Sequence, residues 1–299
     1  MENIKNILKQ NRPNITDSSI NTYASILSNL YKKINNTNKI NDDIEEFFCN
    51  NPSKVIEFLN DVESKKRKTI LASLVVFCRN ETAQNKYRKL MLEDNVKVKE
   101  DNLQQKMPER MKENWVSQDE MKSIYNQLEK ETKPLFSKSK LKMNEIQHIQ
   151  NFIILSLYTL QEPRRLLDYT EMRLRNVDKE KDNYIDKGKF IFNKHKTAKH
   201  FGTQEVPISN KLKLLLGKWS KINDTDYLLV DVNGNKLTQA QLQQRLNKIF
   251  GRQASVNIIR HSYLSDKYKD VPDLKDMVKT ANNMGQVSIQ QALEYVKKK

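Results

Sequence analysis

Glycine is absent from the first 187 residues of this 299-residue chain, and all six glycines lie beyond them, at Gly188, Gly202, Gly217, Gly234, Gly251 and Gly285. Because glycine adopts the positive φ of tight turns most readily, a long stretch without it favours helices joined by loops rich in Asn, Asp and Ser. The same distribution excludes a glycine-rich phosphate-binding loop from this stretch, and G-x-x-x-x-G-K-[ST] occurs nowhere in the chain. The first half is therefore predicted to be helical.

Apolar residues at helical spacing locate the elements more closely. A helix is expected after Thr16 and Asp17, either of which can cap it, and other helices are expected near 53–60, 64–79, 81–94, 146–160, 210–221, 238–250, 254–268, 273–282 and 288–297. Residues 189–208 differ, since KFIFN and QEVPI are typical of two short strands around a basic turn. The predicted fold class is mainly α with one small β-hairpin or sheet.

A polar segment divides the chain. Residues 95–114 look irregular, contain Pro108 and are typical of a linker. Ser117 and Glu120 then match a capping box before an amphipathic helix. We predict two domains, a helical N-terminal domain with its linker at 1–112 and a second domain at 113–299.

Charge and composition narrow the function classes. With 53 basic and 37 acidic residues the net charge is +16, which attracts polyanions such as nucleic acid. No apolar stretch is long enough for a membrane span, and the N-terminus lacks the apolar core of a secretion signal, so we expect an intracellular protein in the cytoplasm or nucleus of a host, or one associated with a virus.

Cys49 and Cys78 lie in apolar contexts and are expected to be buried, reduced thiols. The cysteines and the four scattered histidines show no metal-binding spacing, so no metal is expected.

Four short clusters carry residue types that can act on a phosphodiester. They are Pro163-Arg164-Arg165-Leu166-Leu167-Asp168, Lys194-His195-Lys196-Thr197-Ala198-Lys199, Asn257-Ile258-Ile259-Arg260-His261-Ser262, and Met284-Gly285-Gln286 with Tyr295 nine residues beyond the glutamine. Each is weak evidence alone, because arginine pairs are usually solvated and a tyrosine on a late helix usually packs. Their joint occurrence in this order is more informative.

The order and settings of these clusters resemble the catalytic domain of tyrosine recombinases, the phage integrase family, over roughly 117–299. Arg165 precedes a helix with Asp168 three positions on, Val206-Pro207-Ile208 matches the strand after the family's lysine hairpin, and Arg260 and Tyr295 fall at the family spacings. Within this family, the sequence particularly resembles the integrases of large DNA viruses and related mobile elements. The resemblance implies a DNA breaking-rejoining fold in which two domains form a clamp around duplex DNA.

The resemblance also implies roles for the residues. Arg165 and Arg260 would hold the non-bridging oxygens of the phosphate, and Tyr295 would attack it to form a 3′-phosphotyrosine that conserves the bond energy, without metal, ATP or other cofactor. Lys196 would protonate the departing 5′-oxygen. Lys199 and Arg164 would contact DNA. Apart from the resemblance, the basic start of the helix near 64–79, Lys65-Lys66-Arg67-Lys68, is either a second DNA contact or a solvated helix end.

Three residue-level questions stay open in the sequence. Arg164 is an alternative to Arg165, although only Arg165 has the acid three residues downstream. Lys199 is an alternative to Lys196: counting back from the V-P-I strand favours Lys199, and the Lys-Thr pair favours Lys196, which we choose. Finally, two positions where the family usually has histidine hold Asn257 and Gln286, whose amides bind oxygen but accept no proton; His261 is adjacent to Arg260, with its orientation undetermined.

The function expected from this is a site-specific recombinase or integrase. The alternatives are a type IB DNA topoisomerase, which uses the same nucleophile chemistry, and a non-catalytic DNA-binding descendant, which the two missing histidines favour. Asp224 and Asp226 are a weak basis for a metal-dependent nuclease.

The expected partner is double-stranded DNA, with no membrane. Because only Val296 and three lysines follow Tyr295, too few for a docking helix, we expect a monomer when free that assembles, as a tetramer, on DNA. The target sequence and the direction, integration or excision, are not encoded in these patterns.

Overall fold

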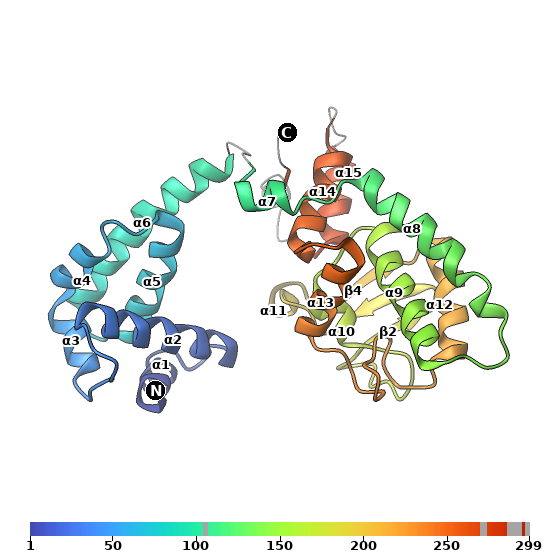
Figure 1. The fold of residues 1–299 in the computed structure, drawn as a ribbon. Helices are drawn as coiled ribbons and strands as arrows, with labels where there is room; N and C mark the ends of the chain where they lie inside the picture. Colours follow the sequence, from blue (N-terminus) through green and yellow to red (C-terminus); the bar gives the residue numbers. More distant parts are fainter. Residues whose placement is uncertain (104–106, 270–273, 286–294, 297–299) are drawn as a thin grey trace. The chain divides into compact units, whose positions relative to one another are not determined.

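Two compact units make up the chain, residues 1–104 and 105–299 (Figure 1). The computed structural model describes residues 1–103, 107–269, 274–285 and 295–296. The boundary predicted from the sequence, between 112 and 113, lies within the second of these units. Asn114 Oδ1 accepts a hydrogen bond from the backbone N–H of Gln253 at 3.0 Å, which attaches this segment to the second unit.

The first unit consists of helices, as its lack of glycine predicts. They are α1 (Glu2–Asn11), α2 (Asp17–Ile34), α3 (Ile44–Asn50), α4 (Pro52–Phe58), α5 (Ser64–Phe77) and α6 (Glu81–Leu103). Thr16 caps α2 by accepting from the N–H of Ser19. Residues 95–103, predicted to be irregular, instead continue α6, because no proline or glycine interrupts the chain before Pro108.

An apolar core of its own stabilises the first unit, with Leu8, Leu27, Phe48 and Phe77 among its fully buried members. Cys49 at the end of α3 and Cys78 after α5 form a disulfide, with a Cα–Cα distance of 5.4 Å. The prediction of two reduced thiols is therefore wrong. Apolar flanks correctly indicate burial, but they carry no information on which two buried residues the helix packing brings together.

The second unit contains the remaining helices and the sheet. Its helical elements are α7 (Glu109–Glu113), α8 (Gln118–Thr132), the 3-10 helix η1 (Leu135–Ser137), α9 (Met143–Thr159), α10 (Leu166–Thr170), α11 (Ala198–Phe201), α12 (Asn210–Ile222), α13 (Gln239–Phe250), α14 (Val256–Lys267) and α15 (Leu274–Asn283). Ser117 caps α8 through the N–H of Glu120, but the Glu120 carboxylate pairs with Arg252 instead of closing a capping box. Most of the helix predicted at 288–297 lies outside the described residues.

A four-stranded sheet lies in the second unit, in the order β1 (Met172–Arg173), β2 (Asn183–Asp186), β3 (Lys189–Phe192) and β4 (Gln204–Pro207). β1 and β2 are parallel, whereas β2–β3 and β3–β4 are antiparallel, with Phe192 opposite Gln204 at the end of the last pair. The predicted hairpin of β3 and β4 is confirmed, and so is the fold class, mainly helical with one small sheet. The sequence did not predict β1 and β2.

Two apolar clusters lie in the second unit. The larger includes Tyr158, Phe190, Phe192 and Trp219 and packs the sheet against helices such as α9, which also contacts α8, α12 and α13 (Figure 1). The smaller is formed by Leu264 and Tyr268, in and directly after α14, and by Met277, Ala281 and Met284, in and directly after α15, with Tyr295 and Val296 packed against it. Among the described helices, none combines the length and the apolar character needed to cross a membrane.

Candidate active site

The arginine pair before α10 splits into two environments. Arg164 is fully buried. Its Nε donates to Asp168 Oδ2 at 2.6 Å, its Nη1 to the carbonyl of Asn283 at 2.7 Å, and its Nη2 to Gln204 Oε1 at 2.9 Å. The guanidinium also stacks over the ring of Phe192, at 4.1 Å from the ring centroid. Arg164 thus connects α10, α15 and the end of the β3–β4 hairpin, and it is enclosed within the protein, whereas the sequence analysis expected it to contact DNA.

Arg165, by contrast, is partly exposed and occupies the N-cap position of α10. Its Nη1 donates to the carbonyl of Gly285 at 2.7 Å. The acid three residues on, Asp168, was the reason for preferring Arg165 over Arg164, yet the structure pairs that acid with Arg164. The two arginines differ in their partners instead: the guanidinium of Arg164 is paired with a carboxylate, whereas Arg165 donates to a backbone carbonyl and is partly exposed.

Gly285 lies directly against both arginines. Its φ is +65°, and a Cβ at this position would be 3.1 Å from Arg164 Nη2 and 3.4 Å from Arg165 Nη1. A side chain here would strain the backbone and displace the guanidinium groups. The glycine of the predicted Gly-Gln element therefore permits close packing of the arginines.

Arg260 lies on α14, the helix that also carries His261. It is fully buried, and its Nη1 donates to the carbonyls of Pro163 at 2.9 Å and Met284 at 3.1 Å. Its Nε and Nη2 make no hydrogen bond of good geometry with the described residues, although a weaker hydrogen bond with the Tyr295 side chain acts to raise the pKa of the guanidinium. Burial lowers the pKa of the guanidinium, and the neighbouring Arg165 lowers it further, against the opposing effect of Tyr295. Unsatisfied buried N–H groups are costly, so they indicate a place for an anionic ligand.

Tyr295 lies beside Arg260, as the resemblance implies. The centroid of its ring is 5.3 Å from Arg260 Cζ, and it stacks on the ring of His261 with centroids 4.4 Å apart. His261 Nδ1 is 2.5 Å from the Tyr295 carbonyl oxygen; since a carbonyl only accepts, Nδ1 carries the proton. The structure thus brings Arg260, His261 and Tyr295 together and determines how His261 is oriented.

Asn257 and Gln286 occupy the two positions where the sequence departs from the family pattern. Asn257 is exposed on α14, one turn before Arg260. Gln286 lies outside the described residues. Within the ranges that the structure describes, no group of three or more His, Cys, Asp or Glu side chains is arranged to hold a metal ion.

The lysine candidates lie on the loop between β3 and β4. Lys196 and Lys199 are exposed, and within the described residues neither makes a hydrogen bond or ion pair. The root of the loop lies near the arginines, because Phe192 and Gln204, at its two ends, both contact Arg164. The exposure of both lysines leaves the choice between them open.

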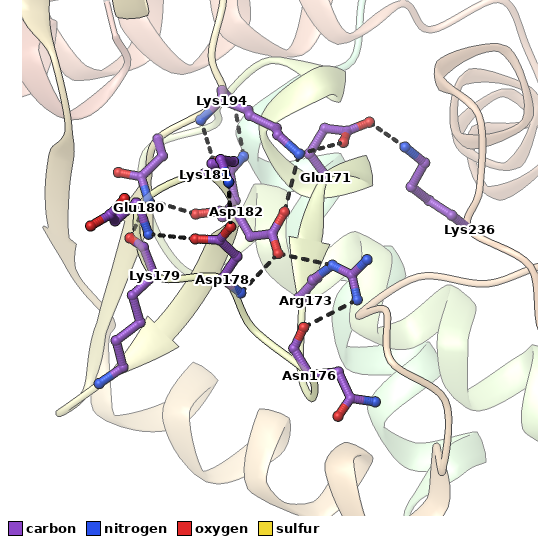
Figure 2. A network of polar contacts seen from close by, with 12 residues as sticks. Glu171, Arg173, Asn176, Asp178, Lys179, Glu180, Lys181, Asp182, Lys194 and Lys236 are labelled. Atoms are coloured by element: carbon purple, nitrogen blue, oxygen red, sulfur yellow. Dashed lines mark hydrogen bonds and ion pairs between the residues drawn. The ribbon is translucent and has the colours of Figure 1, made fainter.

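A polar network behind this loop was not foreseen (Figure 2). Lys194 Nζ lies 3.1 Å from Asp182 Oδ1 and 4.0 Å from Glu171 Oε2, and Glu171 also pairs with Lys236 at 2.5 Å. Arg173 reaches the other oxygen of Asp182 at 3.1 Å. In the sequence these residues resemble ordinary surface charges. The only local sign of the network is the run of charged residues DKEKD at 178–182.

The basic start of α5 is in the first unit. Lys65 and Lys66 are exposed and Lys68 is half-buried. Arg67 instead donates to both oxygens of Asp94 on α6, at 2.9 and 2.7 Å, and to the carbonyl of Asn60 at 3.1 Å. Three of the four basic residues at the start of α5 are therefore at least partly accessible, while Arg67 is paired within its own unit.

Comparison with known proteins supports the fold. No family model matches the sequence, and a search of curated proteins finds no match. Among solved structures, a lambda integrase dimer bound to a COC′ core site aligns at 13% identity over 98% of this chain and 93% of that chain, with a TM-score of 0.53. XerA recombinase aligns at 14% identity over 100% of this chain and 94% of that chain, with a TM-score of 0.44. The structural neighbours are tyrosine recombinases, and the mainly helical fold with its four-stranded sheet is that of the integrase in the first of these alignments.

Proposed function

We propose that this protein is a site-specific DNA recombinase or integrase that cuts and rejoins strands through a 3′-phosphotyrosyl intermediate at Tyr295. The observation that carries the proposal is Arg260, a fully buried guanidinium beside the Tyr295 ring, whose Nε and Nη2 make no hydrogen bond of good geometry with the described residues. A phosphodiester supplies the negative oxygens that such a group binds best. The integrase-like fold supports the same reaction class.

The proposed reaction needs only the residues of this chain. Tyr295 Oη attacks the phosphorus, its proton leaves to solvent, and the bond from phosphorus to the 5′-oxygen breaks. Arg165 and Arg260 stabilise the charge that builds on the non-bridging oxygens. Lys196 gives a proton to the departing 5′-oxygen, and attack by a 5′-hydroxyl on the phosphotyrosine reverses the sequence. Neither metal nor ATP takes part in this scheme.

Duplex DNA is the proposed partner, in keeping with the net charge of +16. Residues 1–112 would act as the N-terminal DNA-binding domain, with contacts from Lys65, Lys66 and Lys68, and 113–299 as the catalytic domain. We propose assembly as a tetramer on DNA from a free monomer. An origin in a large DNA virus or a related mobile element belongs to the same proposal and rests on the sequence resemblance alone.

Covalent trapping tests this function. A library of nicked duplexes with a randomised segment loses a short fragment on cleavage, so the protein stays attached to any member that it cuts. We expect a protein–DNA adduct that maps to Tyr295 and is absent in Tyr295→Phe, whose DNA affinity stays within about twofold because one hydroxyl adds little to many phosphate contacts. An adduct at another residue would contradict the assignment.

Covalent trapping, plasmid relaxation and strand exchange together separate the alternatives. A type IB topoisomerase forms the adduct and relaxes supercoiled plasmid, yet exchanges no strands between two copies of the selected site. A non-catalytic descendant binds DNA and forms no adduct. Strand exchange between two sites is the outcome that we expect.

A further inference from the structure

The loop that carries Lys196 is built around a buried histidine. His195 and Thr197, on either side of Lys196, are 6% and 9% exposed, although the loop lies at the surface. Lys196 itself is exposed. The backbone of the lysine is thus held between two inward-facing neighbours while its side chain points outward.

His195 joins the beginning of the loop to its end. Its Nε2 is 2.9 Å from the carbonyl oxygen of Gly202, which only accepts, so Nε2 carries a proton. Its Nδ1 is 3.2 Å from Thr197 Oγ1. Gly202 has φ +61° and ψ −151°, a conformation essentially confined to glycine, and it ends α11 there. The imidazole therefore spans the turn that contains Lys196, Thr197 and α11.

The root of the loop is fixed separately. Asn183 is fully buried; its Nδ2 donates to the carbonyls of Lys194 at 2.8 Å and Asp168 at 3.0 Å, and its Oδ1 accepts from the N–H of Lys194 at 2.6 Å. The Lys194 side chain reaches Asp182 in the network of Figure 2. Because Asp168 pairs with Arg164, Asn183 connects the loop root to the helix beside Arg165. Beyond the root, backbone hydrogen bonds such as that from the N–H of Ala198 to the carbonyl of His195 shape the turn, and the His195 side chain adds the link across it to Gly202.

We propose that His195 is a positioning residue for Lys196. It holds the turn so that the Lys196 ammonium is presented to the departing 5′-oxygen. The inference rests on the proposed function, in which the proton passes from Lys196 Nζ to that oxygen as its bond to phosphorus breaks. Misplacement of a reacting group by about 1 Å can cost roughly 100-fold in rate, so loss of the imidazole is expected to act through the lysine.

A sulfur substitution isolates this step. When the bridging 5′-oxygen is replaced by sulfur, the leaving thiolate needs no proton, so a defect that acts through Lys196 disappears. We expect His195→Ala to form the Tyr295 adduct about 10- to 100-fold more slowly than wild type on ordinary nicked DNA, and within about threefold of wild type on the sulfur substrate. His200→Ala, which removes an exposed histidine of the same loop, is the matched control and is expected to match wild type on both substrates.

Two more variants keep the test decisive. Lys196→Ala with His195→Ala is expected to be no slower than Lys196→Ala alone, because both changes disable one step. His195→Gln keeps an N–H donor that can reach the Gly202 carbonyl and is expected to recover most of the rate. A His195→Ala defect that persists with the sulfur substrate, or that adds to the Lys196→Ala defect, would overturn the positioning role. Absence of any wild-type adduct with either substrate would instead overturn the proposed function on which it rests.

Discussion

Arg67 in the first unit is mostly buried and Arg260 in the second is fully buried, but their guanidinium groups have different hydrogen-bond partners. Arg67 faces a carboxylate, donating to both oxygens of Asp94. Arg260 has no carboxylate partner among the described residues: its Nη1 donates to two backbone carbonyls, and its other nitrogens make no hydrogen bond of good geometry there. A paired guanidinium stabilises a fold, whereas one with unpartnered N–H groups is costly unless a ligand completes it. The comparison therefore separates an arginine paired within the fold from the one that we propose binds the scissile phosphate.

The largest expected effect is on chemistry and comes from Arg260→Met, which keeps the length of the side chain and removes its charge. We expect adduct formation to fall on the order of 10³-fold and DNA affinity by less than about tenfold, since one phosphate contact among many is lost. The free energy of unfolding should change by no more than about 1 kcal/mol, because relief of charge burial offsets two lost hydrogen bonds. Fluorescence of the buried Trp219 reports unfolding of this unit. A variant that cleaves normally would remove the distinction drawn above.

Gly285→Ala sharpens the same comparison by disturbing the arginines without removing them. Its Cβ would press on Arg164 and Arg165, so adduct formation is expected to slow by about 10- to 100-fold. Gly251→Ala is the matched control: Gly251 has a similar φ of +66° and nothing within 4 Å of the added Cβ. Both variants should lose about 1 kcal/mol of stability, and only Gly285→Ala should lose rate. Equal rates in the two would show that the contact with the arginines is unimportant.

Arg67→Met is expected to have the opposite profile. It leaves the nearly buried Asp94 carboxylate without its partner and should lower the free energy of unfolding of the first unit by about 1–3 kcal/mol. Adduct formation by the folded protein should stay within about threefold of wild type. Hydrogen exchange of peptides from α5 and α6, compared with peptides from α9, reads this stability separately for the two units. If the variant keeps full protection in α5, the Arg67 pair is not what stabilises this region.

The smallest expected effect is the pH dependence of that pair. Its hydrogen bonds with Arg67 hold the pKa of Asp94 below the ordinary value. The stabilisation is thus fully present above the unfolded pKa of about 3.9 and is lost as pH falls through the lower folded pKa. The stability difference between wild type and Arg67→Met should accordingly be constant from about pH 7 to 5 and shrink below about pH 4. A constant difference down to about pH 2 would contradict the pairing.

Local pattern was enough to predict much of the fold. Apolar spacing and caps such as Thr16 located most helices, and the β3–β4 hairpin followed from its alternation and basic turn. β1 was missed because two residues are too short for a pattern, and β2 because NYID resembles the polar loop before it. The Cys49–Cys78 disulfide and the Arg67–Asp94 pair join residues from separate helices, and only the packed structure shows which residues meet.

The candidate site was foreseen in its residue types but not in its contacts. The order of Arg165, Arg260 and Tyr295 carried the resemblance. The spacing of His261 and Tyr295 in the sequence does not predict that their rings stack in the folded protein. Nothing in the sequence indicates that His195 is buried, because a single histidine between two lysines is typical of a solvent-exposed segment. Its burial depends on the carbonyl of Gly202, seven residues away, and is visible only in the folded loop.

The most direct test of the account concerns the charge that Arg260 is proposed to meet. In the site selected by covalent trapping, one non-bridging oxygen of the scissile phosphate can be replaced by methyl, which removes the negative charge that a guanidinium would neutralise. If Arg260 stabilises that charge, Arg260→Ala should form the Tyr295 adduct at least about tenfold faster on the methylphosphonate than on the ordinary phosphate, while Tyr295→Phe stays inactive on both. Equal inactivity of Arg260→Ala on the two substrates, with wild type active on ordinary DNA, would contradict the claim that this buried arginine is kept for the phosphate.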